Sequence, residues 1–227
     1  MTKSKLIQIL DTFSEKQKEL KGLNKEAKIE KLSELFMPIA QHLLCGGYLE
    51  VFSGKKLIRR VFPYTVEFYY HEEEGNVQDP IVYHKNKPEY FKPGTINAHQ
   101  SGIDLTFENK KEKYRASALI RAFRVKEGDD INVDFKNDYD RTTRVKSKDV
   151  EYRSTYIYDY LFTNIPMPIS IKWKPSKWEV KTTPIKGYRV NVFKYDSDPT
   201  KPKELDRKPW AFSLEEFPNK YKLIENR

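Results

Sequence analysis

The spacing of the apolar residues changes abruptly at the pair Gly46-Gly47. Before this pair, apolar residues recur every three or four positions, first in Leu6, Ile9, Leu10 and Phe13 and then in Ile29, Leu32, Leu35 and Phe36, which predicts amphipathic helices. After it they alternate at every second position in residues 48–52, 56–62 and 64–70, which predicts three strands. Helices followed by strands indicate an α+β fold: a single domain with N-terminal helices packed on a curved antiparallel sheet.

The pattern also predicts the boundaries of the individual elements. We expect helices over residues 3–22 and 25–37, with Pro38 opening a further turn. Residues 1–37 would form a helical arm and residues 38–227 the main domain. Further along, the sequence predicts the following segments: a long strand over 95–108, or two strands broken at Gly102; a charged hairpin loop over 109–115; a strand over 116–125; a helix near 147–162; extended loops over 165–187; and strands over 188–195 and 208–217.

The charge of the chain points to a polyanionic partner. Its formal net charge is +9 and its pI about 9.3, which favours nucleic acid first and an anionic membrane surface second. No run of 18 apolar residues is present, so we expect no membrane-spanning helix. The single cysteine, Cys45, excludes an internal disulfide and a cysteine-rich zinc site. The N-terminus does not resemble a signal peptide, and we expect a cytoplasmic monomer.

Polar side chains gather among strand-forming residues in residues 64–121. Glu67 lies between Val66 and Phe68, and three of the chain's four histidines, His71, His84 and His99, lie in the same segment. Such groups are either the solvent-facing residues of a half-buried sheet or the lining of a pocket. The histidines lack close ligand spacing, and the chain has no GxGxxG, Walker A, HExxH or GxSxG motif. We therefore expect no metal and no cofactor.

A second candidate region interleaves basic and aromatic residues. Lys172, Lys174 and Lys177 alternate with Trp173 and Trp178. Lysines neutralise phosphates, and aromatic rings stack on unpaired bases. The alternative is that the tryptophans belong to the core and the lysines only face water. The sequence leaves both interpretations open.

Several short motifs occur in a recognisable order. They are Glu67-Phe68-Tyr69, Asp79-Pro80 with His84, Lys92-Pro93-Gly94-Thr95-Ile96, Ser101-Gly102 and Leu119-Ile120-Arg121-Ala122, followed by two weaker matches, Tyr188-Arg189-Val190 and Pro209-Trp210-Ala211-Phe212. In order and approximate spacing they resemble the alkyladenine (methylpurine) DNA glycosylases. The stronger motifs lie within residues 64–125, and residues 1–37 are outside the resemblance.

This resemblance implies a monofunctional DNA glycosylase in base-excision repair, which hydrolyses the N-glycosidic bond of a flipped, damaged base and leaves an abasic site. Glu67 would be the catalytic carboxylate that activates a water, a role that its apolar neighbours also suit. The base pocket would contain Tyr69, His84, His99, Ser101 and Asp104, and the DNA backbone would contact Lys92, Arg121, Lys172 and Lys174. For Arg121, which interrupts an apolar strand pattern, the alternative is an ion pair with a buried acid. No metal or cofactor is implied.

The sequence departs from the family at the predicted pocket. Ser101 stands where the family has its wedging tyrosine, His99 stands where it has a pocket tyrosine, and Asp104 is an additional carboxylate. A more polar pocket would suit a hypermodified base of the kind that some phages carry, with a role in phage defence; the alternative is a pocket that still accepts alkylated purines. Two other functions stay open: a non-catalytic nucleic-acid-binding protein on the same scaffold, and a metal-dependent nuclease that uses His99 and Asp104.

Overall fold

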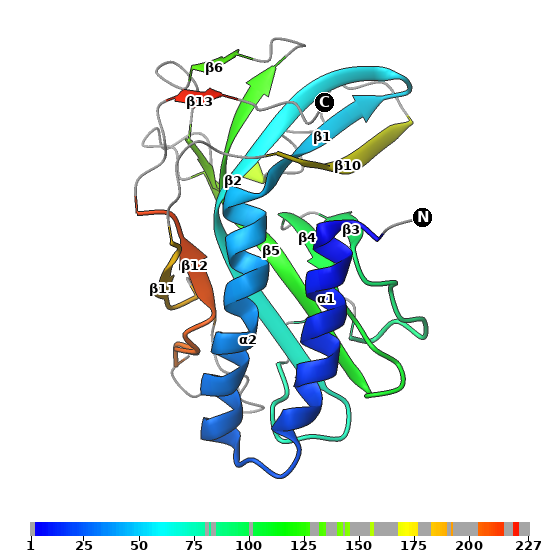
Figure 1. Cartoon of the computed structure of the whole chain (residues 1–227), viewed down its shortest axis with the longest axis vertical. Helices are drawn as coiled ribbons and strands as arrows, with labels where there is room; N and C mark the ends of the chain where they lie inside the picture. The colour runs from blue at the N-terminus through cyan, green and yellow to red at the C-terminus, as the bar shows by residue number, and fades with distance from the viewer. Residues whose placement is uncertain are drawn as a thin grey trace.

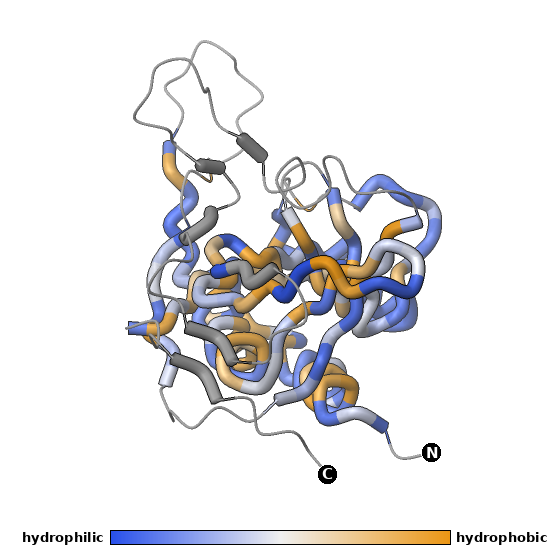
Figure 2. Tube along the Cα trace, turned by 90° about the horizontal axis from the view of Figure 1, so that it is seen from above, coloured by the Kyte–Doolittle hydropathy of each residue, from blue (hydrophilic) through white to orange (hydrophobic). Residues whose placement is uncertain are grey.

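The computed structural model shows an α+β domain in which two helices cover one face of a large antiparallel sheet (Figure 1). The fold class predicted from the sequence is confirmed. The structure describes residues 3–79, 82, 85–99, 102–127, 132–134, 140–142, 144–145, 155–156, 168–176, 183–189, 192, 204–215 and 220–222. Seen from above, the helices lie end-on beside the sheet, and much of their apolar surface is turned inward (Figure 2).

The helices follow the predicted apolar spacing, with two corrections. Helix α1 spans Lys5–Lys16 and is continued by a 3-10 turn, Gln17–Leu20, so the single helix predicted over 3–22 is shorter. Helix α2 spans Lys25–Cys45 and runs through Pro38, where the sequence predicted an end and a new turn. The helix tolerates the proline because Ile39 and the residues after it remain buried against the sheet, which offsets one lost backbone hydrogen bond.

The strands in chain order are β1 Gly47–Ser53, β2 Lys56–Glu72, β3 Thr95–His99, β4 Gly102–Thr106, β5 Tyr114–Glu127, β6 Asn132–Asp134, β7 Asp140–Thr142, β8 Arg144–Val145, β9 Thr155–Tyr156, β10 Ile169–Pro175, β11 Ile185–Gly187, β12 Ala211–Ser213 and β13 Lys220–Lys222. The main sheet has the order β10-β1-β2-β5-β4-β3, with β7 on β5 and with β11-β12 on β2. All of its strand pairs are antiparallel.

Strand β2 corrects the prediction of two separate strands at 56–62 and 64–70. It continues through Pro63, and its register with β5 shifts on both sides of Thr65. A bulge of this kind bends a strand without ending it. Strand β2 is therefore long enough to pair with β1 and β12 as well as with β5.

Other predicted elements have mixed outcomes. Residues 95–99 and 102–106 form the paired strands β3 and β4, which confirms the alternative of two strands over one long strand, and residues 109–113 form the predicted turn before β5. The helix predicted near 147–162 is wrong at Thr155–Tyr156, which form β9. Residues 169–175 are a strand paired with β1, where we expected loop. Most of the strand predicted over 188–195 lies outside the described residues.

The core lies between the helices and the sheet. Phe36 of α2 stacks on Phe68 of β2 with a centroid distance of 4.4 Å, and Trp210 meets Phe36 edge-on at 5.5 Å. Phe13 of α1 also stacks on Phe36, with a centroid distance of 5.6 Å. The boundary predicted after residue 37 therefore falls inside α2, and both helices contribute to the same core as the sheet.

The backbone and packing at Gly94 explain why the motif Lys92-Pro93-Gly94-Thr95-Ile96 contains a glycine. Its φ of +86° is in the left-handed region, and a Cβ built there would lie 2.6 Å from Cδ1 of Ile7 in α1. The turn that opens β3 is therefore packed directly against the first helix. This position serves the fold.

Candidate active site

The face of the sheet opposite the helices carries a row of aligned residues. Asn97 lies across from Asp104, Asp104 across from Leu119, Leu119 across from Glu67, and Glu67 across from Ala211. Residues directly opposite each other in antiparallel strands project to the same face. Because Val66 and Phe68 point toward the helices, Glu67 and the rest of the row point away from them.

Glu67 is enclosed at the centre of this row. Its exposed fraction is 0 %, and the hydroxyl of Tyr69 donates a hydrogen bond of 2.9 Å to its Oε2. Nε of Arg121 lies 3.6 Å from its Oε1, and the Arg121 side chain is 19 % exposed. A carboxylate removed from water is costly unless a countercharge and donors accompany it, and these two neighbours provide both.

Tyr69 remains a hydrogen-bond donor in this environment. Burial raises the pKa of Tyr69 well above its ordinary value, and the neighbouring Glu67 carboxylate raises it further, while Arg189 opposes the shift. The guanidinium of Arg189 lies over the Tyr69 ring at 4.9 Å. The phenol therefore stays protonated and fixes the orientation of the Glu67 carboxylate.

Arg189 organises a buried ionic network behind Tyr69. It donates to the carboxylate of Asp79, to the carbonyl of Phe68 at 3.2 Å, and to Oδ2 of Asp206 at 3.0 Å. Lys208 also donates to Asp206. Burial opposes the charge of Arg189, but Asp79, Tyr69 and Asp206 together outweigh this effect and raise the pKa of Arg189. The network attaches residues 189 and 206 to the edge of the site.

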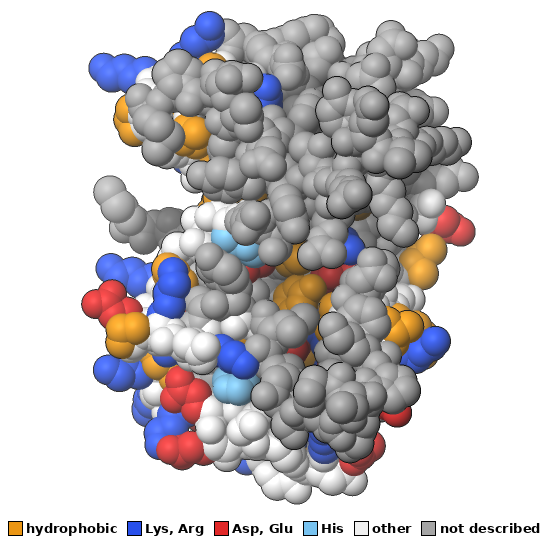
Figure 3. Space-filling model, turned by 180° about the vertical axis from the view of Figure 1, so that it is seen from behind, with side chains coloured by type: hydrophobic (Ala, Val, Ile, Leu, Met, Phe, Trp, Pro, Cys, Tyr) orange, Lys and Arg blue, Asp and Glu red, His pale blue; other side chains and the backbone are white. Residues whose placement is uncertain are grey.

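His99 and Asp104 form a second buried pair on the same face. Nε2 of His99 lies 3.1 Å from Oδ2 of Asp104, and the two side chains are 6 % and 4 % exposed. Asp104 and Glu67 are separated by strand β5, so two strand spacings place their Cα atoms about 10 Å apart. Figure 3 shows histidine and acidic side chains near the middle of this face.

A small apolar cluster covers part of the row. Leu119 packs with Tyr69, Val82 and Val192, and all four side chains are buried. This cluster lies beside Glu67, since Leu119 is its cross-strand neighbour. The carboxylate is thus shielded from bulk water on that side.

The structure brings some of the predicted site residues together and separates others. Glu67, Tyr69 and Arg121 are in contact, and His99 and Asp104 pair on the same face. Of the two roles predicted for Arg121, the structure shows the pairing with a buried acid, Glu67. Lys92 is exposed in the turn before β3, apart from this row. His84 and Ser101 lie outside the described residues.

The sequence left open whether Trp173 belongs to the core or is available to stack on a base, and its position on strand β10 favours the core. This residue packs against the core and lies 5.7 Å from the His42 ring, whereas Lys172 and Lys174 are exposed. Lys55, Lys56 and Arg59 on the neighbouring β1-β2 hairpin were not among the predicted site residues, although the basic residues clustered at 55–60 could have indicated them. We call Lys55, Lys56, Arg59, Lys172 and Lys174 together the basic arm.

Three charged residues of the site, Arg189, Asp79 and Asp206, had no role predicted from the sequence. Arg189 was part of a weak motif, and Asp79 was part of a stronger one, but their ion pair joins residues 110 positions apart. Asp206 was not singled out. Local sequence patterns do not predict an ion pair between residues so far apart in the chain.

Comparison with known protein families, with curated proteins and with solved structures finds no match for this chain. In the part of the chain that the structure describes, no helix is long and apolar enough to span a membrane. Within the same residues, no three histidine, cysteine or acidic side chains are grouped so that they could hold a metal ion.

Proposed function

We propose that this protein is a monofunctional DNA glycosylase in which Glu67 is the catalytic carboxylate. The observation that carries the proposal is the setting of Glu67: a fully buried carboxylate, oriented by Tyr69 and charge-balanced by Arg121, on the face of the sheet that the helices leave free. Buried ionisable groups that are held by a specific charge partner are candidates for functional sites.

Hydrolysis of the N-glycosidic bond requires one proton acceptor and a nucleotide that is flipped out of the duplex. Glu67 accepts a proton from a water whose oxygen attacks C1′ of the sugar. The bond from C1′ to the base nitrogen breaks and its electron pair leaves with the base. The proton that Glu67 took from the water then passes to the base, which regenerates the Glu67 carboxylate. Arg121 and Tyr69 hold the carboxylate in place for this step. His99 and Asp104, on the same face, supply polar groups that can recognise the edge of a base.

The basic arm supports DNA as the substrate. Four of its five cations, Lys55, Lys56, Lys172 and Lys174, are exposed on the β1-β2 hairpin and on β10. Together with a formal net charge of +9, this surface suits a phosphate backbone. Binding by such contacts is insensitive to sequence, and recognition of the base would therefore depend on the site face.

A specific observation favours a second candidate, a non-catalytic nucleic-acid-binding protein. Both carboxylate oxygens of Glu67 have protein neighbours, and the cluster around Leu119 shields it from water. A carboxylate enclosed in this way can serve the fold alone. Under this alternative the basic arm would bind nucleic acid and no base would be released.

The experiment that separates these candidates is mass spectrometry of bases released from a panel of DNAs. The panel contains methylated DNA and phage DNA with hypermodified pyrimidines. Release of a hypermodified base supports the glycosylase, with the polar pair His99 and Asp104 as the reason for the preference, and would make a defence role the next question. Release of 3-methyladenine alone supports the glycosylase but contradicts that preference. Binding without release from any DNA favours the non-catalytic protein.

A further inference from the structure

A polar cavity lies at the edge of the domain, beside the N-terminal end of α2. Its volume is about 920 Å³, within the range of small-molecule sites. Its walls come from α2, from the loop after β2 and from the segment before β12, and they include Lys25, His71, Lys85, Asp206 and Lys208. Asp206 and Lys208 also belong to the ionic network of Arg189.

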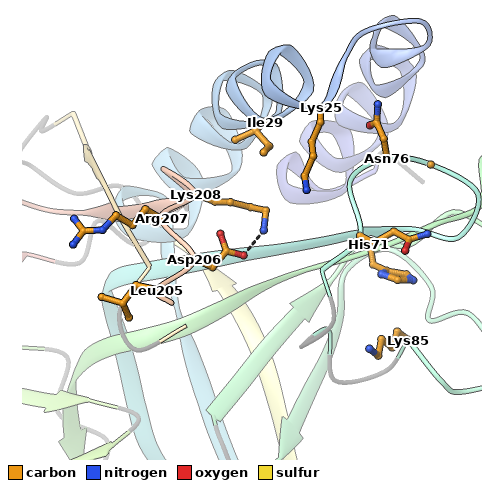
Figure 4. A pocket seen from close by; sticks show the side chains of 11 residues that line it. Lys25, Ile29, His71, Asn76, Lys85, Leu205, Asp206, Arg207 and Lys208 are labelled. Atoms are coloured by element: carbon orange, nitrogen blue, oxygen red, sulfur yellow. Dashed lines mark hydrogen bonds and ion pairs between the residues drawn. The ribbon is translucent and has the colours of Figure 1, made fainter. Parts of the chain in front are cut away.

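Positive charge converges in this cavity. In Figure 4, Lys25 and Lys208 point into the space beside Asp206, the His71 ring is turned toward Lys85, and Arg207 points away. Among the described residues, neither Lys25 nor Lys85 has an ion-pair partner. The carboxylate of Asp206 is already shared by Lys208 and Arg189. The cavity therefore holds uncompensated positive charge, which favours an anion.

His71 adds an independent indication of a ligand. Its Nδ1 is buried and has no hydrogen-bond partner among the described residues, although the ring lines the cavity. Buried polar atoms of a folded protein are nearly always paired, so such an atom at a cavity wall calls for a ligand or a water. Burial lowers the pKa of His71 and the nearby Lys85 lowers it further, while Asp79 and Glu73 act in the opposite direction. A bound anion would relieve the second effect.

We propose that this cavity binds a phosphate-bearing ligand of nucleotide size, with Lys25, Lys85 and Lys208 as its phosphate contacts. The cavity is larger than a single phosphate requires, and Ile29 supplies apolar surface beside the lysines. Ammonium groups are effective phosphate partners because each can donate several charge-assisted hydrogen bonds. The same chemistry could come from a free nucleotide or from the backbone of bound DNA.

The test measures binding by calorimetry with three probes: inorganic pyrophosphate, ATP and a duplex oligonucleotide. The wild type is compared with the double variant Lys25→Gln/Lys85→Gln. The matched control is Lys110→Gln/Lys111→Gln, which removes the same charge from an exposed turn far from the cavity in sequence. We expect the cavity variant to weaken binding by at least about tenfold, the equivalent of one charge-assisted contact, and the control by less than about twofold.

The probes distinguish the sources of the phosphate. Loss of pyrophosphate and ATP binding in the cavity variant identifies a free phosphorylated ligand. Loss of oligonucleotide binding alone identifies the DNA backbone. If the cavity variant binds all three probes as the control does, the proposal is wrong. This result is independent of Glu67, so the proposed glycosylase activity can stand or fall separately.

A spectroscopic measurement on the wild-type protein tests the same cavity and does not depend on whether the cavity variant folds. In wild-type protein, the ring signals of His71, assigned with a His71→Gln variant, should shift on addition of pyrophosphate, or of the oligonucleotide if DNA is the source. Signals of His42, which packs on Trp173 and does not line the cavity, should remain in place. Unchanged His71 signals at saturating concentrations of all the probes would overturn the proposal.

Discussion

Nε of Arg121 on β5 lies 3.6 Å from Oε1 of Glu67 on the neighbouring strand β2. Two motifs that are separated by more than fifty residues in the chain thus meet as one ion pair. The contact gives Arg121 a structural reason to interrupt an otherwise apolar strand, since it compensates a buried negative charge. It also makes the pair a joint target for mutation.

Substitution of Glu67 by glutamine tests the catalytic role. Glu67→Gln keeps the shape of the side chain and removes the proton acceptor, so DNA binding should persist while base release falls by about 10² to 10⁴-fold. The measurement is single-turnover base release beside binding by fluorescence anisotropy. Glu74→Gln, on the loop after β2, is the matched control, because the Glu74 side chain is 70 % exposed. Base release at the wild-type rate in Glu67→Gln would remove Glu67 from the mechanism.

Removal of Arg121 should leave the Glu67 carboxylate without its countercharge. We expect Arg121→Met to lower the free energy of unfolding by about 1–3 kcal/mol, less than for a fully buried pair because the side chain is partly exposed. Urea denaturation provides the measurement. In the double variant Glu67→Gln/Arg121→Met, much of this loss should disappear, because no buried charge remains. Strictly additive losses would show that the two residues are not coupled.

Arg189 should be more important for stability than Arg121. Arg189→Met leaves the buried carboxylates of Asp79 and Asp206 without the positive charge of Arg189. We expect the free energy of unfolding to fall by about 3–5 kcal/mol. Lys186→Met, which breaks an exposed pair with Glu30, is the control and should cost less than about 1 kcal/mol. Thermal and urea denaturation should agree on this order. Equal effects of the two variants would contradict the importance of the buried network.

His42 should make stability fall in weakly acidic solution. Burial lowers the pKa of His42 from its ordinary value to about 4, and the charge of Lys5 adds to the effect. Between this value and the unfolded pKa of about 6.5, the unfolded state binds more protons, so stability rises with pH. The contribution is complete above about pH 6.5 and is lost as the pH falls toward 4. His42→Gln should flatten the pH dependence of the urea midpoint in this window, and an unchanged slope would refute the assignment.

Salt should reveal whether the basic arm contacts nucleic acid. Each lysine that neutralises a phosphate contributes about 0.9 to the slope of log K against log salt. We expect Lys172→Gln/Lys174→Gln to reduce that slope by up to twice this value, whereas Lys110→Gln/Lys111→Gln should leave it unchanged. The measurement is oligonucleotide binding over a range of salt concentrations. Identical slopes for both double variants would exclude a backbone role for these β10 lysines.

Much of the fold follows from local pattern. The spacing of Leu6, Leu10 and Phe13 is enough to predict a helix, and alternation in residues 64–70 is enough to predict a strand, because each pattern buries one side of a regular element. The patterns failed where tertiary packing overrules local preference. Pro38 did not end α2, and Pro63 did not end β2, since burial of the residues beyond each proline stabilises the longer element.

The sequence by itself determined the fold class, the positive charge and the selection of Glu67 and Tyr69 as candidate site residues, because composition, periodicity and neighbouring residue types are local properties. Only the tertiary structure decided which charges meet. Strand register placed Arg121 against Glu67 and His99 beside Asp104, and chain folding brought Arg189 to Asp79. It also gathered Lys25, Lys85 and Lys208 around one cavity. The energy of these contacts depends on distance and burial in space, and the separation of the residues along the chain encodes neither.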